Sequence, residues 1–211
     1  MFKKLLADTI VKWFKSCGIL GRQRFWLLYW AYRITGWHIR HKEWDFVLEY
    51  LPRLGDWQDV HVLDVGCSRN LFLYEIKARG YFCCGIDLEP SLYDFSRDLI
   101  STSILDVRDS ELMANSFTRR FSFVTCISVL EHIENNQDIA LKNMIHALKV
   151  GGRLLLTIPT KEFAQGHPWH GFDITDIEKM LLDGSFTTKF ARIIEYTERA
   201  GQLCLAIERI K

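Results

Sequence analysis

One stretch, His61–Asn70, most constrains how this chain can fold. It starts as an apolar, β-branched run that reaches Asp64 and Gly66, and then opens through small polar residues into a helix-like pattern ending near Arg79. Apolar strands that alternate with amphipathic helices are typical of a parallel sheet covered on both faces. In such a sheet, ligands bind beyond the carboxyl end of the first strand, where the strand order reverses. This turn is therefore the first candidate for a ligand site.

The same alternation of strand and helix patterns continues along the chain. Gly80 and the pair Gly151–Gly152 provide turns from helix to strand. After Gly184 two β-rich segments flank Arg199–Gly201, which predicts a closing hairpin. The predicted fold class is α/β: a doubly wound, seven-stranded, mostly parallel sheet with a C-terminal antiparallel hairpin and an N-terminal helical extension. We expect strands near 61–66, 82–87, 101–105, 121–127, 152–158, 187–197 and 202–211, and helices near 70–79, 91–100, 134–149 and 173–182.

Composition indicates an ordinary globular protein. Apolar residues make up 48% of the 211 residues and charged residues 25%. The longest apolar run, Phe25–Tyr32, has eight residues, whereas a membrane span needs about 20. Asp8, Lys12 and Lys15 interrupt any signal-peptide core. The six cysteines show no CxxC spacing, so we expect reduced thiols in a cytoplasmic protein and no metal site.

The first 55 residues differ from the rest in charge and aromatic content. Residues 1–42 carry nine Lys and Arg but only one acid, whereas the other 169 residues carry a net charge of −7. Nine aromatic residues lie within the first 37. We expect a helical, basic, aromatic-rich extension over 1–55. It could be a cap whose aromatic residues pack on the core or line a pocket, a basic amphipathic surface over 1–35 on an anionic membrane, or a nucleic-acid contact.

Acids follow the predicted second and third strands at positions typical of nucleotide binding. Asp87 lies 21 residues after Gly66, and an acid about 20 residues after such a turn binds the hydroxyls of a ribose. Asp106 follows the third strand, where its carboxylate could accept a hydrogen bond from an adenine amino group. The fourth strand leads into Ser128–Ile133, and the fifth begins after Gly151–Gly152.

Together these segments resemble the class I S-adenosylmethionine-dependent methyltransferases, which have a Rossmann-like fold. Val62–Asn70 is similar to the first motif of that family, and Gly85–Asp87 to its second-strand acid. Ile127–Ile133 is similar to its Ser-Val-Leu-Glu-His segment, and Leu148–Pro159 to its glycine turn and fifth strand. The resemblance covers residues 60 to 160 directly. It implies S-adenosylmethionine as the cofactor and makes 56–211 the methyltransferase domain.

The resemblance also implies a role for individual residues of this sequence. Asp87 would bind the ribose hydroxyls of the cofactor. The methionine part would lie in the turn formed by Asp64, Gly66, Cys67 and Ser68, with Asp64 reaching its ammonium through a water. Leu88 would pack on the adenine, Asp106 and the Val107 amide would contact the adenine edge, and the backbone of Ile127 and Ser128 would flank the methionine.

The glycine-rich turn departs from the pattern of the family. The usual Gly-x-Gly-x-Gly reads Gly66-Cys67-Ser68-Arg69-Asn70 here, although serine is small and asparagine tolerates left-handed backbone. One alternative is therefore a degenerate methyltransferase-like binding or scaffold module without turnover, and another is a peripheral membrane protein that uses the fold as a scaffold. A nicotinamide-dependent oxidoreductase is disfavoured, because Gly-x-Gly-x-x-Gly is absent and the closing hairpin does not belong to that fold.

Two histidines are candidates for the general base that an alcohol acceptor would need. His132 follows the fourth strand; His170 follows the fifth, in a segment that also offers His167 and Trp169 as a pocket wall. The alternative interpretation of this segment is a surface loop in which Asp173 caps the next helix. The motifs do not identify the acceptor. We expect a small molecule, either a saccharide or a lipid-linked molecule, and not a nucleic acid, because the domain is acidic.

Overall fold

The computed structural model describes residues 38–51, 60–67, 71–89, 100–182 and 190–211. The chain divides into two compact units, residues 1–42 and 43–211, and the sheet and the site described below belong to the second unit. The predicted helices before residue 37 and over 91–99 lie outside the described residues. The predicted domain boundary at residue 55 stays a prediction.

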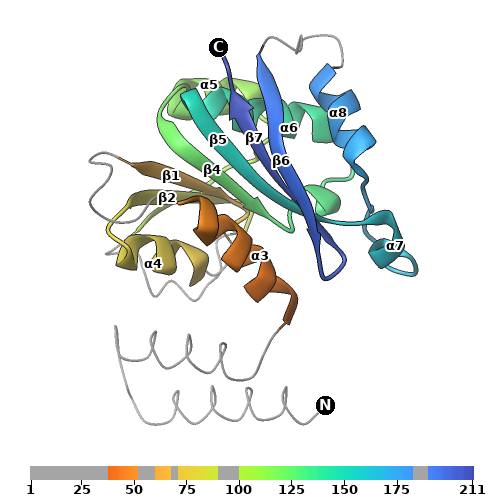
Figure 1. Cartoon of the computed structure of the whole chain (residues 1–211). Helices are drawn as coiled ribbons and strands as arrows, with labels where there is room; N and C mark the ends of the chain where they lie inside the picture. Colours follow the sequence, from red (N-terminus) through yellow and green to blue (C-terminus); the bar gives the residue numbers. More distant parts are fainter. Residues whose placement is uncertain (1–37, 52–59, 68–70, 90–99, 183–189) are drawn as a thin grey trace. The chain divides into compact units, whose positions relative to one another are not determined.

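Seven strands form one sheet in the order β3-β2-β1-β4-β5-β7-β6 (Figure 1). The first five run parallel, and β7 is antiparallel to both β5 and β6. The predicted α/β fold with its C-terminal antiparallel hairpin is therefore confirmed. The strands are β1 (His61–Val65), β2 (Phe82–Asp87), β3 (Ser101–Ile104), β4 (Phe121–Ile127), β5 (Leu148–Pro159), β6 (Ala191–Arg199) and β7 (Gln202–Arg209).

Helices occur near the predicted 70–79, 134–149 and 173–182, whereas the short helices Ser110–Phe117 and Lys161–Ala164 were not predicted. No helix was predicted after Asp106, but Asp109 caps one there by accepting a hydrogen bond from Leu112 N at 3.0 Å. β5 begins at Leu148, which pairs with Phe121, so it starts four residues before the predicted 152. The helices are α3 (His38–Tyr50), α4 (Leu71–Ala78), α5 (Ser110–Phe117), α6 (Gln137–Ala147), α7 (Lys161–Ala164) and α8 (Ile174–Leu182), with a 3₁₀ turn η1 (Leu130–His132).

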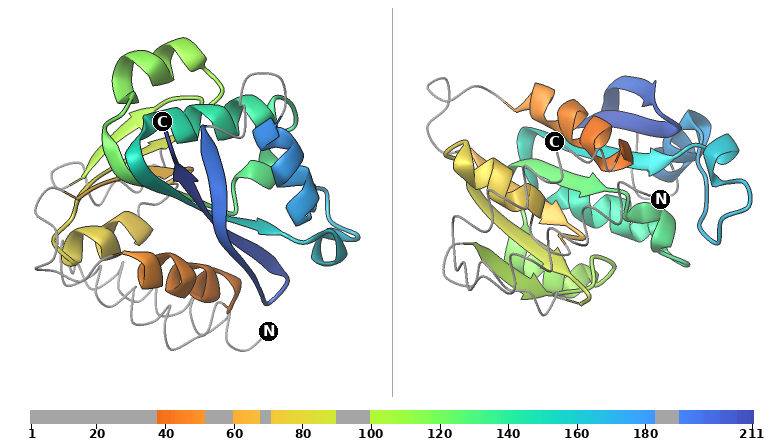
Figure 2. Two further views of the ribbon diagram at one scale, coloured as in Figure 1. Left: turned by 45° about the horizontal axis from the view of Figure 1, so that its top comes forward. Right: turned by 90° about the horizontal axis from the view of Figure 1, so that it is seen from below.

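The two faces of the sheet have different chemistry because side chains alternate along each strand. One face is apolar: Leu63, Val124, Leu154 and their neighbours form a single cluster with the buried side of α6. The strand register places Asp64, Thr125 and Thr157 on the other face. Figure 2 shows α3 and α6 on opposite sides of the sheet, so the polar residues face α3.

No helix in the described ranges is long and apolar enough to cross a membrane.

Candidate functional site

The carboxyl ends of β1 and β4 form the point at which the strand order reverses. From β1 the chain continues outward to β2 and β3, and it then returns to place β4 on the other side of β1. The loops after β1 and β4 therefore continue toward opposite edges of the sheet, and open α/β sheets bind ligands at such a point.

The turn after β1 requires glycine for two reasons. Gly66 has a φ of +76°, which L-residues with a side chain rarely adopt, and a Cβ at this position would lie 2.2 Å from Val129 Cγ2. Gly66 N and Cys67 N both donate to Ile86 O, at 2.8 and 3.1 Å. The β1 turn is thus held against β2 and touches the segment after β4, as a site shared by these loops requires.

The side chain of Cys67 points into the protein and not toward a ligand. Cys67 is 7% exposed, and its Sγ would lie 2.6 Å from a Cβ placed on Gly85. Burial raises the pKa of the Cys67 thiol well above its usual range. Of this residue, only the backbone is suited to contact a cofactor. Ser68, the next residue predicted to contact the cofactor, lies outside the described residues.

Asp64 is a buried carboxylate fixed by the neighbouring strand. It is 4% exposed, and Thr125 Oγ1 donates to its Oδ1 at 2.6 Å. The register of β1 and β4 places these two residues directly opposite each other. The predicted first-motif acid therefore has a defined orientation on the α3 side of the sheet.

Asp87 and Leu88 end β2 at the same edge. Asp87 is partly exposed, and its Oδ1 accepts a hydrogen bond from Glu89 N at 3.0 Å, which orients the carboxylate. Leu88 is 59% exposed, so its side chain is accessible to a ligand. An oriented acid followed by an exposed apolar side chain suits the predicted contacts with ribose and adenine, which stay predictions.

Asp106 is already engaged within its own loop. Arg108 Nε donates to Asp106 Oδ1 at 3.0 Å, and Arg108 Nη2 donates to Oδ2 at 2.7 Å. These hydrogen bonds and the guanidinium charge lower the pKa of Asp106. Val107 is buried, and its carbonyl accepts from Asn143 Nδ2 at 2.8 Å. An adenine contact by Asp106 would have to share a carboxylate that Arg108 already binds.

The residue after β4 is linked to a buried acid that the sequence did not single out. Ser128 has a φ of +51°, and its N donates to Thr157 O at 3.0 Å. Its Oγ donates to Oε1 of Glu43, and Thr157 Oγ1 donates to the same oxygen at 2.9 Å. Glu43 lies on α3 and is 0% exposed. In the sequence, Glu43 is an acid next to the apolar Trp44 within a helical pattern, and this did not mark it as a site residue.

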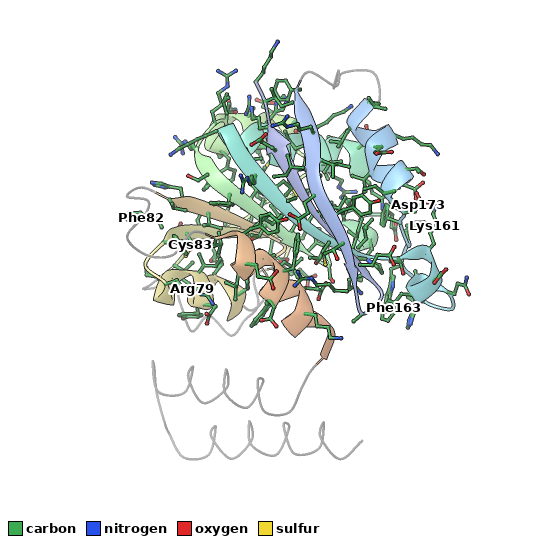
Figure 3. All side chains as sticks on the ribbon, in the orientation of Figure 1. Arg79, Phe82, Cys83, Lys161, Phe163 and Asp173 are labelled. Atoms are coloured by element: carbon green, nitrogen blue, oxygen red, sulfur yellow. The ribbon has the colours of Figure 1, made fainter. Side chains whose placement is uncertain are left out.

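The loop after β5 folds back onto the segment after β4. The rings of His132 and Trp169 meet edge to face at 5.8 Å, and His167 stacks on Trp169 at 4.2 Å. Phe163 extends the stack at 6.1 Å from His167 and lies against the β6–β7 hairpin (Figure 3). We call these four side chains the aromatic array. His170 N donates to Glu131 O at 3.5 Å, so both predicted base candidates come from segments in contact.

Asp173 caps helix α8, as the alternative interpretation of this segment predicted. Its Oδ1 accepts from Asp176 N at 3.0 Å at the start of α8, and its Oδ2 accepts from Lys161 Nζ at 2.6 Å (Figure 3). The Lys161 hydrogen bond lowers the pKa of Asp173 far below its usual range.

His170 lines a cleft of about 670 Å³ with residues of α6 and α8, including Gln137 and Met180.

The described cysteines are free thiols, as predicted. Cys126 and Cys204 are buried, and burial raises the pKa of Cys83 to about 12 and of Cys84 to about 11. Thiols with such high pKa values are not nucleophiles at neutral pH. The described thiols are therefore not candidates for a catalytic role in the site.

The strand order with its antiparallel β7, the glycine turn between β1 and β4, and the acid at the end of β2 define the class I S-adenosylmethionine-dependent methyltransferase fold. The methyltransferase domain family matches residues 36–199. The chain belongs to this family, and the resemblance drawn from its motifs is confirmed.

Curated relatives share part of this domain. The chain is 28% identical over 120 residues to a ubiquinone biosynthesis O-methyltransferase of Coxiella burnetii, covering 55% of this chain and 50% of the relative. It is 33% identical over 114 residues to the protein of the same name from Xanthomonas oryzae pv. oryzae, covering 52% and 47%. The chain therefore spans about half the length of the curated relatives it matches.

Solved structures with the same fold have low sequence identity. A protein from Pyrococcus horikoshii OT3 superimposes with a TM-score of 0.64 at 14% identity, covering 82% of this chain and 90% of the other. The N-methyltransferase NodS from Bradyrhizobium japonicum WM9, in complex with S-adenosyl-L-homocysteine, gives 0.60 at 17% identity, covering 81% and 86%. These similarities establish the fold and say nothing about the acceptor.

Two glycines with nearly the same backbone conformation test the turn after β1. Gly66 and Gly151 have φ values of +76° and +78°, but no described atom lies within 4 Å of a Cβ built on Gly151. Gly151→Ala should lower the free energy of unfolding by about 1–2 kcal/mol, the cost of a left-handed alanine. Gly66→Ala should cost about 1–3 kcal/mol more, because Val129 must move. Urea denaturation of both variants measures this; equal losses would contradict the described contact.

Proposed function

We propose that this chain binds S-adenosylmethionine at the edge formed by β1, β2 and β4 and transfers its methyl group to a small-molecule acceptor. The packing of Gly66 against Val129 carries this proposal, because it brings the turn after β1 and the segment after β4 together at the edge where open α/β sheets bind ligands. The oriented carboxylate of Asp87 lies at the end of the adjacent strand β2. The residues present fit the cofactor that the family uses.

The residues at this edge would bind the two ends of the cofactor separately. Asp87 would accept hydrogen bonds from both ribose hydroxyls, and Leu88 would cover the adenine. Asp64 and the Gly66 turn would hold the methionine part, with Ser128 on its other side. The bound cofactor supplies an activated methyl group on a sulfonium, so the task of the protein is to align the acceptor with it.

We propose further that the acceptor carries a hydroxyl group and is lipid-linked, with a saccharide as the alternative. Two observations support this choice. The curated relatives are named as O-methyltransferases of ubiquinone biosynthesis. The aromatic array lies beside the segment after β4 and offers flat apolar surfaces with two imidazoles. His132 or His170 would accept the hydroxyl proton as the oxygen attacks the methyl group.

Cofactor binding is the first test. Calorimetric titration should show micromolar binding of S-adenosylmethionine and S-adenosylhomocysteine to the full chain. Asp87→Ala should raise both dissociation constants by about 10- to 100-fold, since it removes charge-assisted hydrogen bonds to the ribose. Glu89→Ala is the matched control, because it removes an exposed acid of the same loop and keeps the Glu89 backbone N–H. If wild type binds neither ligand, the degenerate scaffold module replaces this proposal.

Turnover tests the base. With tritiated S-adenosylmethionine and a prenylated phenol as acceptor, His132→Ala should lower kcat by about 100-fold or more while cofactor affinity is kept. His61→Ala is the control, because His61 stacks on Phe82 at 5.2 Å at the amino end of β1, away from the carboxyl edge. Unchanged kcat in His132→Ala would remove His132 from the reaction, and the same assay on His170→Ala then decides the remaining candidate.

The acceptor class leads to a proposal about location. We propose that the protein is cytoplasmic and contacts membranes peripherally through residues 1–35, which lie outside the described residues. The basic excess of residues 1–42 supports this, because each basic residue near an anionic surface contributes about 1 kcal/mol. Replacing Lys3, Lys4, Lys12 and Lys15 by Glu should release the full chain from anionic vesicles in co-sedimentation. Equal sedimentation of the variant and wild type would rule out this contact.

A further inference from the structure

Glu43 is a buried acid whose charge is not balanced in the described part of the chain. It is 0% exposed, and Ser128 and Thr157 both donate to Oε1. Oε2 is buried as well and has no hydrogen-bond partner among the described residues. No ion pair within those ranges includes Glu43. Burying a carboxylate without a cation is costly, which suggests that a ligand supplies the missing partner.

Its surroundings place this carboxylate on the cofactor side of the sheet. Thr157 lies on the same face as Asp64, as the strand register requires. Ser128 is the first residue after β4, and the next residue, Val129, contacts the Gly66 turn. Two buried carboxylates, Asp64 on β1 and Glu43 on α3, therefore approach the same edge from two elements.

The anchoring of Glu43 leaves one oxygen for a ligand. Ser128 and Thr157 both donate to Oε1, which fixes the carboxylate to the residue after β4 and to β5 at once. Oε2 then keeps its lone pairs and the negative charge in a region shielded from water, where attraction to a cation is strong. The cofactor proposed above has two cationic groups, an ammonium and a sulfonium, and the sulfonium becomes a neutral thioether when the methyl group leaves.

We propose that Glu43 Oε2 faces the sulfonium end of S-adenosylmethionine and makes the site prefer the charged cofactor to the neutral product. The inference rests on the proposed function. Glu43 is a binding residue in this account, since it takes no proton and forms no bond. Its effect is to favour release of S-adenosylhomocysteine after transfer, because the product no longer has the charge that Oε2 balances.

Glu43→Gln tests the proposal, because it keeps the shape of the side chain and removes its charge. Calorimetry on the full chain should show that S-adenosylmethionine binds about 10- to 100-fold more weakly, while the affinity for S-adenosylhomocysteine changes less than about threefold. Glu49→Gln is the matched control. Glu49 lies on the same helix but is exposed and paired with Arg199 at 2.7 Å, so its loss should leave both affinities unchanged.

The thermal stability of the ligand-free protein gives a second readout. The melting temperature of Glu43→Gln should be equal to or above that of wild type, because an amide is less costly to bury than an unbalanced carboxylate. If Glu43→Gln does not fold, Thr157→Val keeps the carboxylate, removes one of its anchors and should shift the same affinity ratio by a smaller factor.

The outcomes separate this inference from the proposed function. Equal weakening of both ligands, or no change in either, would overturn the sulfonium contact. Unchanged cofactor affinities with a raised KM for the acceptor would assign Glu43 to acceptor binding and would also overturn it. If wild type binds neither ligand, the proposed function fails first, and Glu43 then has no cofactor to balance.

Discussion

The close contact between the turn after β1 and the segment after β4 is the constraint on which the site depends. Gly66 has a left-handed backbone and no room for a Cβ beside Val129, so any side chain would push the two loops apart. Within the same pair of strands, Thr125 on β4 donates a hydrogen bond to the carboxylate of Asp64 on β1. The backbone conformation of Gly66 and the buried hydrogen bond between Thr125 and Asp64 thus fix β1 and β4 relative to each other at the point where the strand order reverses.

Buried carboxylates determine which ligands suit this edge of the sheet. Asp64 and Glu43 are both buried on the α3 side of the sheet, whereas the opposite face is apolar and packs on α6. Hydroxyl groups of Ser128 and Thr157 orient one of these carboxylates without neutralising it. A site with two buried negative groups favours a cationic ligand, and the cationic part of S-adenosylmethionine is the part that reacts. In the proposed function, the aromatic array would provide an apolar surface for the acceptor.

The sequence predicted the elements whose signals are local. Apolar runs located β1, β2 and β4, and the position of Asp87 followed from its spacing after Gly66. The pairing of Asp106 with Arg108 was missed because it depends on a side-chain conformation in a loop. Helix α5 was missed because its eight residues give only a weak periodic signal and Asp109 was not considered as its cap. Glu43 was missed because an acid in an amphipathic helix normally faces water, and only tertiary packing buries it.

A crystal structure of the full chain grown with S-adenosylhomocysteine tests the account most directly. We expect the ribose at Asp87 and the homocysteine beside Gly66 and Ser128, with its sulfur directed toward the carboxylate of Glu43. Electron density for the ligand at the opposite end of the strands would contradict the account. A cleft of about 470 Å³ lined by Phe82 and Cys83 lies there, and both residues are labelled in Figure 3. An amino-acid moiety that points away from Ser128 would contradict it equally.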